Sequence, residues 1–121
     1  MISARLGATS ADAANKFLPK AQKRFFDDEA QVIQEVLNGR AHAAVASAPL
    51  PAFQALKYPD KLFLPFQGTF TKEPIGFAVR KGDFDTICFL NSWIEDNLSD
   101  GWIRSRYKYW FESLDWQSMT Q

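Results

Sequence analysis

Short apolar runs alternate with amphipathic segments along the first half of the chain. Residues 2–6, 22–26 and 42–46 lie between turn-forming residues and predict three short strands. Between the strands, residues 10–18 and 32–37 carry apolar side chains at helical spacing. The pattern therefore predicts strands that alternate with helices.

Residues typical of helix ends mark the two helical segments. Asp28 is followed three positions later by Gln31, and Thr9 is followed at the same distance by Asp12. This spacing is typical of the first turn of a helix, where polar side chains bond to free N–H groups. Gly39 ends the second helix, as glycine does just after a helix C-terminus.

The second half of the chain continues with a helix from about Pro49 and with predicted strands at residues 61–66 and 75–80. Two helices then precede a tail at residues 114–121. Their predicted apolar faces are Ile87, Leu90, Ile94 and Leu98 in the first, and Ile103, Tyr107, Trp110 and Phe111 in the second. This order of elements predicts an α/β fold with a mostly parallel sheet, helices on both faces, and ligands beyond the carboxyl ends of the strands.

Composition narrows the function classes. The 121 residues suit one domain, and the 14 basic and 14 acidic side chains balance, which argues against a nucleic-acid or polybasic membrane partner. With one cysteine, Cys88, and one histidine, His42, we predict no disulfide, no metal and no cofactor. No glycine pattern for nucleotides and no serine-nucleophile motif is present, so we predict no catalytic residues. Nor do we find a signal peptide in this chain.

Three stretches, in order, are similar to the family 3 extracellular solute-binding proteins, the polar-amino-acid receptors of ABC importers. They are residues 38–45, residues 73–83, and the Trp-rich groups within residues 91–111. The resemblance implies a periplasmic-binding-protein-like (type II) lobe with two C-terminal helices. It implies that residues 1–82 form the second lobe, and that residues 83–121 form helices which in the family return to the first lobe.

The resemblance also points to the turn at Gly7, Ala8, Thr9 and Ser10. The family has a Gly-Ser/Thr-Thr turn here that contacts the ligand carboxylate; Thr9 matches this pattern and Ala8 departs from it. A helix N-terminus offers free N–H groups and a partial positive charge to such a ligand. The alternative is that Thr9 or Ser10 simply caps the helix.

Arg5 and Ser47 are two further candidates for ligand contacts. Arg5 precedes the turn, and a family side chain near this position reaches the ligand; the alternative is a solvated arginine at a strand end. Ser47 stands near the place where amino-acid-binding members carry an Asp that pairs with the ligand ammonium. Without a carboxylate here, either the ligand lacks an α-amino group or the first lobe supplies the charge. The alternative for Ser47 is that it caps the helix after Pro49.

These features together predict the non-catalytic, small-molecule-binding component of an ABC import system, present as a fragment. By resemblance, its location is periplasmic or extracytoplasmic, its parent has a signal peptide, and its partners are a small polar ligand and a membrane permease. We further expect self-association through the Trp-rich C-terminal helices. The alternatives are an extracytoplasmic ligand-sensing domain of a receptor and a small dehydratase-like enzyme on the same fold.

Overall fold

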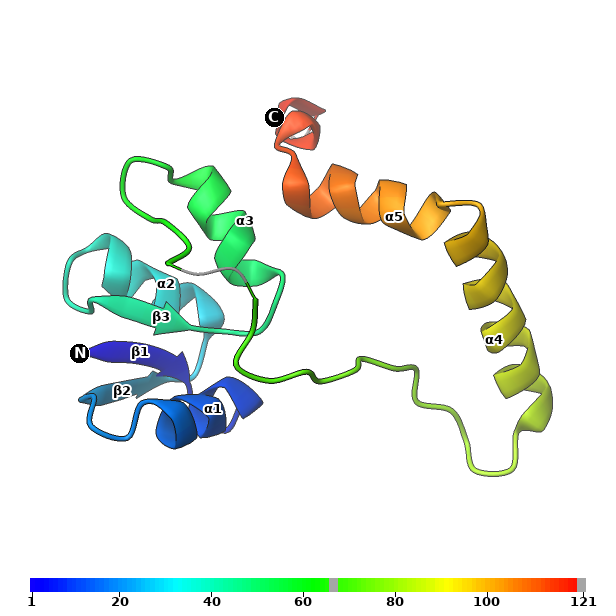
Figure 1. Cartoon of the computed structure of the whole chain (residues 1–121), viewed down its shortest axis with the longest axis horizontal. Coiled ribbons are helices and arrows are strands. Elements are labelled where there is room, and N and C mark those ends of the chain that lie inside the picture. The colour runs from blue at the N-terminus through cyan, green and yellow to red at the C-terminus, as the bar shows by residue number, and fades with distance from the viewer. Residues whose placement is uncertain (66–67, 120–121) are drawn as a thin grey trace. The chain divides into compact units, whose positions relative to one another are not determined.

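The computed structural model describes residues 1–65 and 68–119 and divides the chain into two compact units (Figure 1). Unit 1 is Met1–Lys72 and unit 2 is Glu73–Gln121. The expected division between residues 82 and 83 falls inside unit 2.

Unit 1 contains a three-stranded parallel sheet in the order β2-β1-β3. Its strands are β1 (Ile2–Arg5), β2 (Lys23–Phe26) and β3 (Ala43–Val45). The central strand aligns Ile2 with Lys23 on one side and with Ala43 on the other. The structure therefore confirms the predicted α/β class and its parallel sheet.

Helices follow each of these strands. They are α1 (Thr9–Phe17), α2 (Glu29–Leu37) and α3 (Leu50–Lys57). The chain moves from β1 to β2 through α1, and then back across β1 to β3 through α2. Because parallel crossovers are right-handed, this change of direction puts α1 and α2 on opposite faces of the sheet.

Two neighbouring residues of β1 point to opposite faces of the sheet, each toward a different helix. Ser3 is fully buried, and its hydroxyl donates to the Val32 carbonyl of α2 at 2.9 Å. Ala4 packs instead with Ala11 and Ala14 of α1. Small side chains, mainly alanine and serine, therefore make up much of the core of unit 1.

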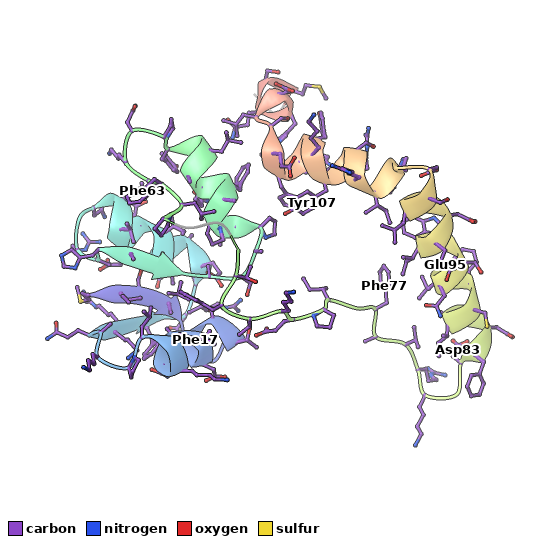
Figure 2. All side chains as sticks on the ribbon, in the orientation of Figure 1. Phe17, Phe63, Phe77, Asp83, Glu95 and Tyr107 are labelled. Atoms are coloured by element: carbon purple, nitrogen blue, oxygen red, sulfur yellow. The ribbon has the colours of Figure 1, made fainter. Side chains whose placement is uncertain are left out.

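The structure contradicts the two later strand predictions. The described part of residues 61–66 contains no strand, and Phe63 there is 81% exposed (Figure 2). Residues 75–80 form no helix, strand or turn and pair with no strand among the described residues. A strand needs the backbone of a neighbour as well as suitable side chains, and the sequence pattern shows only the side chains.

Unit 2 contains the two predicted C-terminal helices, α4 (Phe84–Ser99) and α5 (Trp102–Tyr107). A π-helical turn (Lys108–Glu112) and a 3-10 helix (Asp115–Met119) follow α5. Trp93 and Trp102 meet edge to face with ring centroids 5.9 Å apart. No described residue of unit 2 is fully buried, so its aromatic and aliphatic side chains remain open to water.

Candidate ligand-binding site

The carboxyl edge of the sheet gathers the connections in which the sequence predicts ligand contacts. In the order β2-β1-β3, the chain reverses direction between β1 and β3. Open parallel sheets bind ligands outside the carboxyl ends of the two strands at such a reversal. The turn after β1 contains Gly7 and Ala8, and the connection after β3 contains Ser47. Topology therefore assigns these connections to one edge.

The N-terminus of α1 has no side-chain cap. Its N-cap residue is Ala8, in extended conformation at φ −95° and ψ 156°. Ala11 and Asp12 donate their N–H groups to the Ala8 carbonyl at 2.9 and 3.5 Å. Thr9 and Ser10 are the first two helical residues, and no described group accepts from their N–H groups. The interpretation of Thr9 or Ser10 as a helix cap is therefore wrong.

Ser10 adds a second, independent feature at this N-terminus. Its residue surface is only 5% exposed, and its Oγ has no hydrogen-bond partner among the described residues. A buried hydroxyl without a partner costs about 1–3 kcal/mol, so such groups are rare unless they serve a bound molecule. The hydroxyl and the free N–H groups of Thr9 and Ser10 form a set of donors at the positive end of a helix.

Gly7 makes the approach to this helix possible. Its φ of +69° lies in the left-handed region, which residues with a Cβ rarely adopt. The turn lets the chain leave β1 and enter α1 within three residues, 6–8, while the Ala8 N–H bonds weakly to the Arg5 carbonyl at 3.4 Å. The turn thus exposes backbone donors of α1 at the sheet edge.

Arg5 is exposed and ends β1 on the side of α2. Side chains alternate along a strand, so Arg5 shares the face of Ser3, which bonds to α2. Its charge acts on Glu29, the first residue of α2. Burial raises the pKa of Glu29, while the positive charge of Arg5 lowers it and Asp28 raises it further. Arg5 thus exerts its charge on Glu29, and its contact with a ligand stays a prediction.

Ser47 lies in the exposed connection after β3. The register aligns Ala4 of β1 with Val45 of β3, so this connection begins beside the turn that follows β1. The Ser47 carbonyl accepts from the Leu50 N–H at 3.1 Å, but the N-cap of α3 is Pro49, and no side chain caps this helix. The alternative that the Ser47 side chain caps α3 is therefore wrong.

The sequence gives no sign of the interaction between Arg5 and Glu29. It does predict the role of the neighbouring Asp28 at the start of the helix, where the Asp28 side chain accepts from the Ala30 N–H at 2.9 Å. One Glu29 carboxylate oxygen, in contrast, is buried without a partner among the described residues. Only the parallel pairing of β1 with β2 brings Arg5 and Glu29 together, and no local sequence signal shows it.

The described part of the chain shows neither a metal-binding arrangement nor a membrane span. Within residues 1–65 and 68–119, no group of three His, Cys, Asp or Glu side chains is placed to hold an ion. In the same residues, no helix is both long enough and apolar enough to cross a bilayer.

Comparison with known proteins gives the class of the fold. No protein-family model matches the chain, and no curated protein matches it. Among solved structures it is similar to the "Ancestral Cationic Amino Acid Solute Binding Protein (AncCDT-1)", with 38% sequence identity and a TM-score of 0.74 over 91% of this chain. The fold is thus the α/β fold of a periplasmic-binding-protein-like lobe.

A second solved structure carries a further description. It is the "ancestral amino acid-binding protein AncCDT-1, a precursor of cyclohexadienyl dehydratase", with 38% identity and a TM-score of 0.69. The chain spans 46% of the first of these proteins and 45% of the second. It is therefore similar to about half of an amino-acid-binding protein.

Proposed function

We propose that this chain binds the carboxylate of a small, amino-acid-like ligand at the N-terminus of α1, as one side of a two-lobed solute-binding protein. The state of this N-terminus carries the proposal: α1 has no side-chain cap, and the nearly buried Ser10 hydroxyl has no hydrogen-bond partner among the described residues. The protein is non-catalytic in this proposal and serves an ABC importer.

A carboxylate suits this set of donors. Its two oxygens accept from the N–H groups of Thr9 and Ser10 and from the Ser10 hydroxyl. The helix dipole places partial positive charge at the same point. A bound carboxylate thus accepts hydrogen bonds from groups that otherwise bond to water or remain without a partner.

The ligand ammonium needs a negative partner from elsewhere. Residues 46–49, after β3, contain no carboxylate. In a two-lobed protein the other lobe supplies that charge; a ligand without an α-amino group is the alternative. With half of the contacts absent, this chain binds weakly, since association still costs translational and rotational freedom.

The names of the two solved proteins support a polar ligand of the amino-acid class. As a solute-binding protein of an ABC importer, the chain is proposed to have an extracytoplasmic location, a signal peptide in its parent protein and a membrane permease as its partner. The exposed aromatic side chains of unit 2, including Trp102 and Trp110 at 47% and 48% exposure, support self-association as a further property.

An enzyme is the second candidate, favoured by the description of one neighbour as a precursor of a dehydratase. Water elimination requires a positioned general acid, and the connections after β1 and β3 contain no carboxyl or imidazole side chain. Loss of water from a hydroxylated carboxylic acid, followed by the absorbance of the new double bond, would establish this candidate in place of a binding protein.

The binding proposal is tested with L-arginine and agmatine, its analogue without the carboxylate, by NMR titration of the labelled chain. L-Arginine at millimolar concentrations is expected to shift the amide signals of Thr9 and Ser10, and agmatine is expected to leave them in place. Equal shifts with both molecules, or none with either, would overturn the proposal.

Replacing Ser10 separates binding from folding. Ser10→Ala removes a buried hydroxyl that has no partner among the described residues, so the free energy of unfolding is expected to rise by about 1–3 kcal/mol. L-Arginine binding is expected to weaken at least about tenfold, since one hydrogen bond to a charged group is worth about 1.5–3 kcal/mol. Ser92→Ala, on exposed α4, is the matched control and leaves both quantities unchanged. Unaltered binding by the Ser10 variant would contradict the assigned role.

A further inference from the structure

Residues 75–80 of unit 2 have the composition of a strand but no partner. The segment Ile-Gly-Phe-Ala-Val-Arg forms no helix, strand or turn, and no backbone group of residues 75–79 hydrogen-bonds to any described residue. The next carbonyl, that of Arg80, accepts from the Asp83 N–H at 3.1 Å and begins the turn into α4. An apolar extended segment with free N–H and C=O groups is a template for pairing with another strand.

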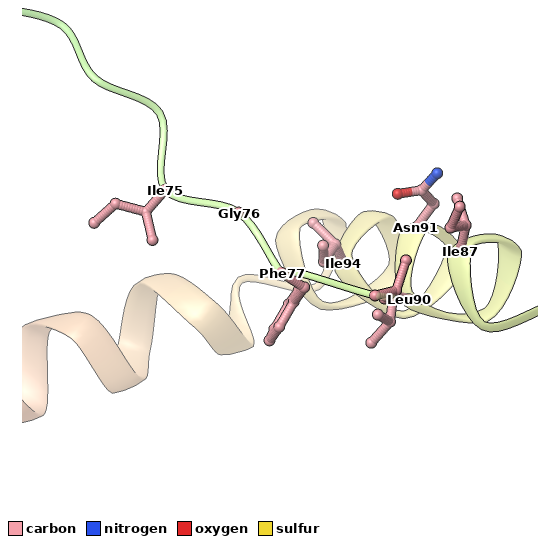
Figure 3. Close-up of a pocket in the computed structure, with 8 residues that line it drawn as sticks. Ile75, Gly76, Phe77, Ile87, Leu90, Asn91 and Ile94 are labelled. Carbon is pink, nitrogen blue, oxygen red and sulfur yellow. The ribbon is translucent and has the colours of Figure 1, made fainter. Parts of the chain in front are cut away.

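One face of this segment is apolar and open. Ile75, Phe77 and Val79 alternate along it, and with the α4 side chains Ile87, Leu90 and Ile94 they line a groove of about 450 Å³ (Figure 3). Ile75 is 92% exposed and Phe77 is 65% exposed. The segment therefore runs beside the apolar face of α4 without closing it.

The charges at the two ends of the segment indicate which strand fits. Glu73 precedes it, and Arg80 and Lys81 end it. A parallel copy would bring like charges together, whereas an antiparallel copy brings Glu73 of each chain to the basic end of the other. The segment is thus complementary to itself in the antiparallel direction.

We propose that two copies of this chain associate by antiparallel pairing of residues 73–81, with Phe77 opposite Phe77 of the second copy. This register aligns Ile75 with Val79 and Glu73 with Lys81, each pair occurring twice. Ile75, Phe77 and Val79 of both copies then share one face, against the α4 helices of both copies.

The same register accommodates Pro74. When the Phe77 pair is a hydrogen-bonded pair, Ile75 and Val79 are hydrogen-bonded as well, and Pro74 falls at a position that donates no bond across the ladder. An isolated two-stranded ribbon is marginally stable in water, but here the apolar face of α4 supports each strand. The pairing uses no residue of the candidate ligand site.

The register is tested by cross-linking. In a Cys88→Ser background, which removes the chain's one cysteine, Phe77→Cys places two thiols directly opposite each other, with Cα atoms about 5.5 Å apart. Ala78→Cys in the same background is the matched control, because its thiols lie on a diagonal of about 7–8 Å. Mild oxidation is expected to yield a covalent dimer from the first variant alone; equal cross-linking of both would overturn the register.

Charge exchange tests the pairing without removing Phe77. Glu73→Lys or Lys81→Glu turns two attractive pairs into two repulsive ones, which weakens dimerisation about tenfold in sedimentation equilibrium. The double variant restores dimerisation to the original strength. Asp60→Lys, the same charge change in unit 1, leaves it unaltered. A monomer mass at all concentrations, or a double variant as weak as the single ones, would overturn the proposal.

Discussion

Helices α1 and α2 have nine residues each, follow neighbouring parallel strands and cover opposite faces of one sheet, yet their N-termini differ. At α2, the Asp28 side chain accepts from the Ala30 N–H at 2.9 Å. At α1, the equivalent residue is Ala8, which offers no side-chain oxygen. A side chain therefore accepts from an N–H group in the first turn of α2, whereas no side chain does so at α1.

The difference shows where stability and binding separate in this fold. A side-chain cap contributes about 1 kcal/mol to a helix, so α1 lacks a stabilisation that α2 has. In return, the donors of α1 remain available to an external anion at the sheet edge. A cap and a carboxylate ligand compete for the same N–H groups.

Making α1 like α2 is expected to have the largest effect. Ala8→Asp supplies the missing cap and places a negative charge where the ligand carboxylate binds. L-Arginine binding is expected to weaken more than about tenfold in an NMR titration, while the free energy of unfolding rises by about 1 kcal/mol.

Ala8→Asn is the control for the Ala8→Asp variant, since it caps the helix without adding a charge. It is expected to stabilise the chain similarly and to weaken binding less. Undiminished binding by the Asp variant would place the ligand elsewhere than at α1.

Making α2 like α1 is expected to have a smaller effect, on stability alone. Asp28→Ala removes the bond to the Ala30 N–H and lowers the free energy of unfolding by about 1 kcal/mol in urea denaturation. Asp28→Asn retains the acceptor and recovers most of the loss. If Asp28→Ala unfolds at the same urea concentration as the original chain, the α2 cap contributes nothing.

The smallest expected effect concerns Glu29 and pH. Burial raises the pKa of its carboxyl group, so the folded chain holds this proton more tightly than the unfolded chain. Glu29 therefore favours folding most below its ordinary pKa, roughly 4.3, and this contribution disappears as pH rises through the folded pKa.

Glu29→Gln is expected to flatten this part of the stability profile, as followed by urea denaturation between about pH 4 and pH 6. Asp27→Asn, a neutralisation in the same acidic group, is the control. If Glu29→Gln retains the full pH dependence of the original chain, another carboxyl group is responsible.

The sequence predicted the three strands of unit 1, its first three helices and both C-terminal helices, because their signals are local. Asp28 at the start of α2 and Gly39 after its end are examples of such signals. It also indicated the turn at residues 7–10 and Ser47 as candidates, and these roles stay predictions. It misjudged the cap of α1, because whether Thr9 or Ser10 bonds to a free N–H depends on where the turn at Gly7 directs the chain.

By itself, then, the sequence determined the alternation of strands and helices, because side-chain periodicity and helix-end chemistry act between residues close in the chain. Only the tertiary structure decided which backbone groups find partners. The strand-like residues 75–80 remain unpaired because pairing requires a neighbouring backbone. Arg5 acts on Glu29 because β1 and β2 lie side by side. Ser10 is buried, with no partner in the described part of the chain, because α1 packs on the sheet.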